Sequence, residues 1–84
     1  MRVILVEDNL SLAKGIENAL KDQGHAVDHL EDGLDADAFL SRQTADVAII
    51  DINLPRLCGL EIIRRMRARR DTMPILVLTA QGKT

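Results

Sequence analysis

Two spacings of apolar residues alternate along this chain, and this alternation is the feature that most constrains its fold. Short runs of valine, isoleucine and leucine are typical of strands buried on both faces of a sheet. Between these runs, apolar residues recur every three or four positions, which indicates amphipathic helices. Strands are predicted at residues 2–6, 25–30, 46–51 and 75–79, and helices at residues 9–23, 33–42 and 60–70.

The predicted order is βαβαβαβ, a single α/β domain. Strands that alternate with helices form parallel sheets, because each helix carries the chain back to the start of the next strand. We therefore expect a parallel sheet with helices on both faces. In this architecture, ligands bind at the carboxyl ends of the strands, where the strand order reverses.

The composition excludes several classes of protein. Apolar residues make up 46% of the chain, which is enough for a packed core. The formal net charge of −2 gives no overall attraction to nucleic acid or to an anionic membrane. No apolar stretch is long enough to span a membrane, and the single cysteine, Cys58, has no partner for an internal disulfide. We expect a cytoplasmic protein with no membrane association.

Acidic residues follow two of the predicted strands at the point where each strand ends. Glu7 and Asp8 come directly after the first strand, and Asp51 ends the third. If these strands are neighbours, the three carboxylates lie together, and like charges that close require a cation between them or a raised pKa. Mg²⁺ prefers such oxygen ligands and can share a phosphate oxygen. A carboxylate beside it can act as a nucleophile in phosphoryl transfer.

Each acid also has an ordinary structural explanation. Asp8 or Asn9 could cap the following helix, and Asp51 could open a turn ahead of Pro55. For any one acid alone, the structural role is the more common one. The combination after two strands favours a functional site.

Other polar features of the sequence predict no further site. The arginines of residues 60–70 share their helix with an apolar stripe, and cations near a helix C-terminus are favourable in any case. His25 and His29 lie on one predicted strand without a nearby cysteine, so they do not predict a zinc site.

The acids belong to a larger set of short motifs. These are the run Val6-Glu7-Asp8-Asn9, the strand that ends in Asp51 with Leu54-Pro55 and Gly59 after it, and the fourth strand ending in Thr79-Ala80. Together they resemble the receiver domain of bacterial two-component response regulators. The resemblance implies a flavodoxin-like, doubly wound parallel sheet with strand order 2-1-3-4.

The resemblance also implies a role for each residue of the motifs. Asp51 would be the phosphoacceptor, and a sensor histidine kinase would supply the phosphoryl group. Mg²⁺ would be held by Glu7, Asp8, Asp51 and the backbone carbonyl of Asn53. Thr79 would be the switch hydroxyl that bonds a phosphate oxygen, and Leu54, Pro55 and Gly59 would shape the loop beside the acceptor.

Further expectations concern partners and extent. The motifs look most like those of regulators that carry a winged-helix DNA-binding domain, so DNA would be contacted only through an output domain outside residues 1–84. These residues would form the N-terminal portion of a receiver, without its final strand and last helices. The fourth strand would then be an apolar edge that favours self-association. The implied role is that of a signalling phosphoacceptor and not of an enzyme.

Two other functions stay open at this point. A degenerate or truncated receiver could bind partners without being phosphorylated, although Glu7, Asp8 and Asp51 are all present. A Mg²⁺-dependent hydrolase could form an aspartyl phosphate, but such enzymes use a second acid two residues after the nucleophile, and that position is Asn53. Their nucleophile also normally follows the first strand.

Overall fold

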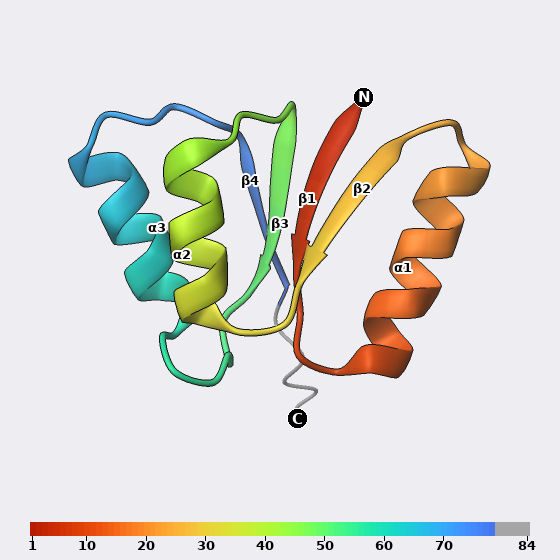
Figure 1. Cartoon of the computed structure of the whole chain (residues 1–84), viewed down its shortest axis with the longest axis horizontal. Helices are drawn as coiled ribbons and strands as arrows, with labels where there is room; N and C mark the ends of the chain where they lie inside the picture. The colour runs from red at the N-terminus through yellow and green to blue at the C-terminus, as the bar shows by residue number, and fades with distance from the viewer. Residues whose placement is uncertain (79–84) are drawn as a thin grey trace.

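The structure is a computed structural model that describes residues 1–78, and it contains one four-stranded parallel sheet with helices on both faces (Figure 1). The strands lie in the order β2-β1-β3-β4, which confirms the predicted doubly wound arrangement. Along the chain the elements are β1 (Arg2–Val6), α1 (Leu10–Asp22), β2 (Ala26–Leu30), α2 (Gly33–Arg42), β3 (Val47–Asp51), α3 (Gly59–Ala68) and β4 (Ile75–Leu78).

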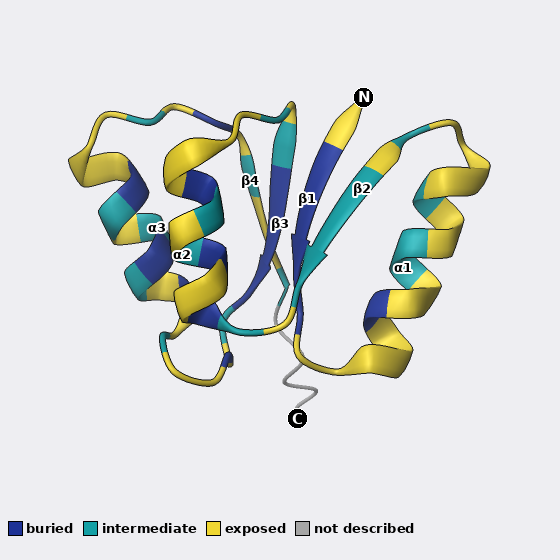
Figure 2. Ribbon diagram, viewed as in Figure 1, coloured by how far each residue is buried: buried dark blue, intermediate teal, exposed yellow. Residues whose placement is uncertain are grey.

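The two faces of the sheet carry separate apolar clusters, because successive side chains of a strand point to opposite faces. Helix α1 covers one face, and α2 and α3 cover the other (Figure 1). The cluster under α1 contains Val3, Leu5, Ala13 and Ile49. The cluster under α2 and α3 is larger and includes Ile4, Val6, Ala48 and Ile50 of the strands with Ala36, Leu40, Ile62 and Met66 of the helices. Strands β1 and β3 are therefore the most buried part of the molecule (Figure 2).

Local chemistry explains where the helices begin and end. The Asn9 side chain caps α1 by accepting a hydrogen bond from the Leu12 amide at 3.1 Å. Helix α3 ends at Ala68, two residues earlier than predicted, because Arg70 adopts a left-handed conformation with φ of 64°. The amides of Arg70 and Asp71 then bond the carbonyls of Arg67 and Met66, a common way for a helix to end. None of the helices in residues 1–78 combines the length and apolar character needed to cross a membrane.

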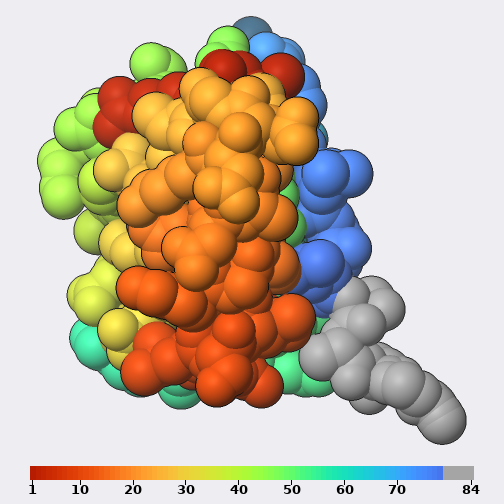
Figure 3. All heavy atoms as spheres, turned by 90° about the vertical axis from the view of Figure 1, so that its right-hand side faces the viewer, coloured from red at the N-terminus to blue at the C-terminus, as the bar shows by residue number. Residues whose placement is uncertain are grey.

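Strand β4 lies at the edge of the sheet and is less covered than the other strands. Leu76 and Val77 are 60% and 45% exposed. In Figure 3, which looks onto the α1 side, the blue segment that contains β4 is visible beside α1. Within residues 1–78, β4 is therefore an apolar strand at a sheet edge, as expected from the sequence.

Candidate functional site

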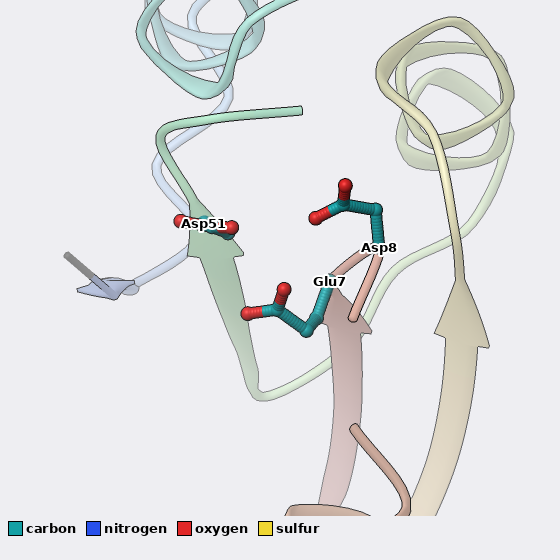
Figure 4. A group of neighbouring side chains, drawn as sticks. All are labelled: Glu7, Asp8 and Asp51. Carbon is teal, nitrogen blue, oxygen red and sulfur yellow. The ribbon is translucent and has the colours of Figure 1, made fainter. Parts of the chain in front are cut away.

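The carboxyl ends of β1 and β3 bring three acidic side chains together. The two strands are parallel neighbours with Val6 opposite Ile50, so Glu7 and Asp51 lie at the same level of the sheet. One carboxylate oxygen from each of Glu7, Asp8 and Asp51 lies within 4.8 Å of the others. Figure 4 shows their carboxyl groups around a common space between the strand ends. The predicted convergence of these acids is therefore present.

The protein surroundings satisfy these carboxylates only in part. The Asn9 amide donates a hydrogen bond to Glu7 Oε2 at 3.0 Å, and the Asn53 amide donates one to Asp51 Oδ1 at 3.3 Å. Glu7 Oε1 is buried and accepts no hydrogen bond from the residues that the structure describes. Glu7 and Asp51 are only 1% and 2% exposed, whereas Asp8 is exposed. A buried carboxylate oxygen without a hydrogen-bond partner is costly, and it is well suited to bind a cation.

The electrostatic environment of the three acids also indicates a cation site. Burial raises the pKa of Glu7 above its ordinary value, and the nearby charge of Asp51 raises it further, against the opposing effect of the Asn9 amide. Within residues 1–78, no lysine or arginine forms an ion pair with Glu7, Asp8 or Asp51. A set of carboxylate oxygens with an unpartnered buried member is the donor set that a hard divalent cation such as Mg²⁺ prefers. These residues fit such an ion.

The backbone around Glu7 is fixed by the neighbouring strand. Its amide bonds the carbonyl of Leu30 at 3.1 Å. Its carbonyl lies 2.8 Å from Nε2 of His29, and since a carbonyl only accepts, this ring nitrogen carries the proton. The sequence analysis assigned His29 no role. A histidine that supports the backbone of an acidic residue gives no signal in a single sequence.

The loop after Asp51, residues 52–58, is called here the acceptor loop, and it packs closely on β3. The Gly59 amide donates to the carbonyl of Ile52 at 2.9 Å. A Cβ atom at position 59 would lie 2.1 Å from the Asp51 carbonyl oxygen, so this position requires glycine. Leu54 is 9% exposed and belongs to the larger apolar cluster, and the Pro55 carbonyl accepts hydrogen bonds from the amides of Gly33 and Leu57. Leu54, Pro55 and Gly59 thus lie in or next to the loop that they were predicted to shape.

Two predicted site features remain as predictions. The Asn53 amide donates a hydrogen bond to Asp51 Oδ1, whereas the predicted metal bond involves the Asn53 carbonyl and stays a prediction. Thr79, the predicted switch hydroxyl, lies outside the described residues. Three further residues near the site were not predicted. Asp32 and Gly33 contact the acceptor loop from the start of α2, and Arg56 is the loop residue that pairs with Asp32.

Comparison with known proteins gives the family. Residues 3–84 match the profile of the response regulator receiver domain, so the chain belongs to the receiver domain family of two-component response regulators. It is 47% identical over 82 residues to the transcriptional regulatory protein TctD of Salmonella typhimurium. This match covers 98% of this chain and 37% of TctD. It is 46% identical over 81 residues to the transcriptional regulatory protein PhoP of Escherichia coli, covering 96% and 36%. The chain thus spans about a third of the length of these curated relatives.

Solved structures agree on the fold. The receiver domain of the Francisella response regulator 1452 superposes with a TM-score of 0.92 at 24% identity, covering 99% of this chain and 69% of that one. The response regulator TrrA of Thermotoga maritima, solved in complex with Mg²⁺-BeF, gives 0.89 at 27% identity, covering 96% and 70%. Both confirm the receiver fold predicted from the motifs.

Proposed function

We propose that this chain is a phosphoacceptor in two-component signalling, with Asp51 as the residue that is phosphorylated. Glu7, Asp8, Asp51 and the Asn53 carbonyl would hold Mg²⁺. The observation that carries the proposal is the convergence of three carboxylates at the ends of β1 and β3, with Glu7 Oε1 buried and without a partner in the described residues. The structure of TrrA in complex with Mg²⁺-BeF, a member of the same family, supports this choice of ion.

The chemistry expected of this site is the transfer of a phosphoryl group from a nitrogen atom of the kinase to an oxygen atom of Asp51. An Asp51 carboxylate oxygen forms a bond to the phosphorus of a phosphohistidine on the kinase, and the bond to the imidazole nitrogen breaks, leaving the electron pair on that nitrogen. When bound, Mg²⁺ neutralises the charge that accumulates on the phosphoryl oxygens.

The residues of the chain would prepare the nucleophile. The hydrogen bond from the Asn53 amide to Asp51 Oδ1 restrains the rotation of the carboxylate. The low exposure of Asp51 limits the access of water to the acyl phosphate. Glu7 must be ionised to hold a cation, and since its pKa is raised without one, metal binding and proton release are coupled.

The expected partners follow from the same proposal. A sensor histidine kinase would donate the phosphoryl group in the cytoplasm. Both named relatives are transcriptional regulatory proteins of which this chain spans about a third. A DNA-binding output domain, of winged-helix type as the motifs indicate, would lie outside residues 1–84 and would respond to the state of Asp51.

We also propose that the 84-residue chain associates with itself through β4. Leu76 and Val77 expose a large part of their apolar surface on an edge strand, and such edges pair readily with other chains. Sedimentation velocity across a range of concentrations should show dimers or larger species. A replacement of Val77 with lysine should shift the chain toward monomer, and a wild-type chain that stays monomeric throughout would contradict the proposal.

The experiment that tests phosphorylation is the intact mass of the chain after incubation with a small-molecule phosphodonor, with and without Mg²⁺. We expect a gain of one phosphoryl group that requires Mg²⁺ and is absent in Asp51→Asn. An Asp28→Asn variant provides a matched control, because Asp28 lies in the middle of β2, opposite Ile4, and not among the acids at the carboxyl ends of β1 and β3. Absence of any gain in the wild-type chain would favour the alternative of an interaction module that is not phosphorylated.

A further inference from the structure

The acceptor loop contains a residue in a conformation that its side chain disfavours. Arg56 has φ of 70°, in the left-handed region that glycine adopts freely and other residues rarely do. Among the described residues, only Arg56 and Arg70 are non-glycine residues with positive φ. Arg70 ends a helix, where this conformation is common. Arg56 lies three residues after Asn53 and needs a different explanation.

The explanation lies at the start of α2. Arg56 Nη1 lies 2.9 Å from Asp32 Oδ2, and the Asp32 side chain is the less exposed partner at 16%. The other oxygen of this carboxylate, Oδ1, accepts a hydrogen bond from the Asp35 amide at 2.9 Å and caps α2. The Asp35 amide, and after it the charge of Arg56, lower the pKa of Asp32, which keeps the carboxylate ionised. Asp32 is thus held in place by the helix while it binds the loop.

A backbone contact joins the same two segments. The Gly33 amide donates to the Pro55 carbonyl at 3.0 Å. A Cβ atom at position 33 would lie 1.7 Å from the carbonyl oxygen of Leu57, so the start of α2 is packed directly against the acceptor loop. Gly33 thus contacts the residues on either side of Arg56, Pro55 before it and Leu57 after it.

We infer that Arg56 is a positioning residue, whose ion pair with Asp32 holds the acceptor loop in the bend that sets the Asn53 backbone beside Asp51. The inference rests on the proposed function, since Asn53 is proposed to supply a metal ligand. A left-handed arginine and a surface ion pair have free energies of the same order and opposite sign, so the pair can offset the cost of the bend. Without the pair, a side chain at position 56 favours a right-handed or extended backbone, and the loop shifts.

Two substitutions separate backbone conformation from charge. Arg56→Ala removes the pair and keeps the left-handed penalty, whereas Arg56→Gly removes the pair and the penalty together. Arg2→Ala is the matched control, because Arg2, the first residue of β1, forms a similar pair with Asp28 at 2.8 Å. Each variant removes one arginine charge. The readouts are the Mg²⁺ dissociation constant from calorimetry and the hydrogen exchange of the Asn53 and Leu57 amides without metal.

We expect Arg56→Ala to raise the Mg²⁺ dissociation constant roughly three- to tenfold and to speed exchange at Asn53 and Leu57 by a similar factor. Arg56→Gly should stay within about twofold of wild type, and Arg2→Ala should match it. Equal losses in Arg56→Ala and Arg56→Gly would overturn the inference, because charge and not backbone conformation would then matter. So would an Arg56→Ala variant that behaves as wild type. A wild-type chain that binds no Mg²⁺ would refute the proposed function, while metal-free exchange would still decide the role of Arg56.

Discussion

Acidic side chains lie towards both ends of the parallel sheet, but their hydrogen-bond and ion-pair partners differ. Towards the amino end, the guanidinium of Arg2, the first residue of β1, reaches Asp28 in the middle of β2 at 2.8 Å, and Asp46, just before β3, accepts a hydrogen bond from the Arg2 amide at 2.7 Å. At the carboxyl end, Glu7, Asp8 and Asp51 approach one another, and no arginine or lysine of residues 1–78 pairs with them. Asp28 is paired with a cationic side chain and Asp46 with a backbone amide, whereas the three acids at the carboxyl end are arranged so that they can bind a cation.

Burial makes the contrast larger. The Asp28 side chain is 41% exposed, where water and salt screen its charge and its pair contributes little. Glu7 is 1% exposed, so its charge is poorly solvated and its neighbours of like sign act more strongly. The clustered acids at the carboxyl end therefore lower the free energy of unfolding when no cation is bound. Such clusters are typical of functional sites.

The largest effect should come from the close packing that supports the acidic end. Gly59→Ala forces a Cβ atom against the Asp51 carbonyl, 2.1 Å away, and the backbone must move. We expect the free energy of unfolding to fall by about 2 kcal/mol or more, because overpacked sites relax at the expense of their neighbours. Gly15→Ala in α1 is the control, since nothing lies within 4 Å of its Cβ, and it should add about 0.5–1 kcal/mol. Urea unfolding measures both, and a neutral Gly59→Ala would contradict the packing.

Removal of one charge from the acidic end should stabilise the chain when Mg²⁺ is absent. Asp51→Asn relieves repulsion of Glu7 and Asp8, and we expect a gain of about 1 kcal/mol in the free energy of unfolding. Saturating Mg²⁺ should stabilise the wild type and reverse the order of the two proteins. Thermal unfolding with and without Mg²⁺ measures this. A destabilised Asp51→Asn without metal would show that the three acids are not in conflict.

The pH dependence of stability should also separate the two ends. The pKa of Glu7 is raised in the folded chain, so this group binds a proton more tightly when folded. Its contribution is favourable below the unfolded pKa of about 4.5 and is lost as pH rises through the higher folded pKa. Glu7→Gln should remove this part of the pH profile. Urea midpoints of both proteins between mildly acidic and neutral pH test it, and identical profiles would count against the assignment to Glu7.

The smallest effect is expected at the amino end. Asp28→Asn breaks the exposed pair with Arg2 and should lower the free energy of unfolding by no more than about 1 kcal/mol. The loss should shrink at high salt, because salt screens exposed charges. Mg²⁺ should stabilise this variant as much as the wild type. A variant with a weaker response to Mg²⁺ would show that the two ends are linked.

The features predicted from the sequence are those with a local signal. The apolar runs predicted strands β1 and β3. Because these strands are neighbours, the sequence also predicted that Glu7, just after β1, and Asp51, at the end of β3, lie close together. The left-handed backbone of Arg56 and Arg70 could not be predicted, because arginine does not favour it and the cause lies in contacts made after folding. For the same reason, the early end of α3 was missed.

Contacts between distant segments were also beyond a single sequence. Gly33 could not be distinguished from any helix-start glycine, since its requirement comes from the Leu57 carbonyl 24 positions later in the chain. Asp32 is an ordinary helix-capping residue in the sequence, so nothing there predicts its ion pair with Arg56. The proximity of the three acids could be predicted, whereas the lack of a partner for Glu7 Oε1 within residues 1–78 depends on how the surrounding chain folds.

The most direct test of the account is a Mg²⁺ titration followed by amide chemical shifts of the whole chain. We predict saturable shifts at Glu7, Asp8, Asp51 and Asn53, at the carboxyl ends of β1 and β3, with no change at Asp28 and Asp46. Both ends are observed in one sample, so the amino end serves as an internal control. Equal shifts at the two ends, or none at the carboxyl end, would contradict the claim that the carboxyl end is built to hold a cation.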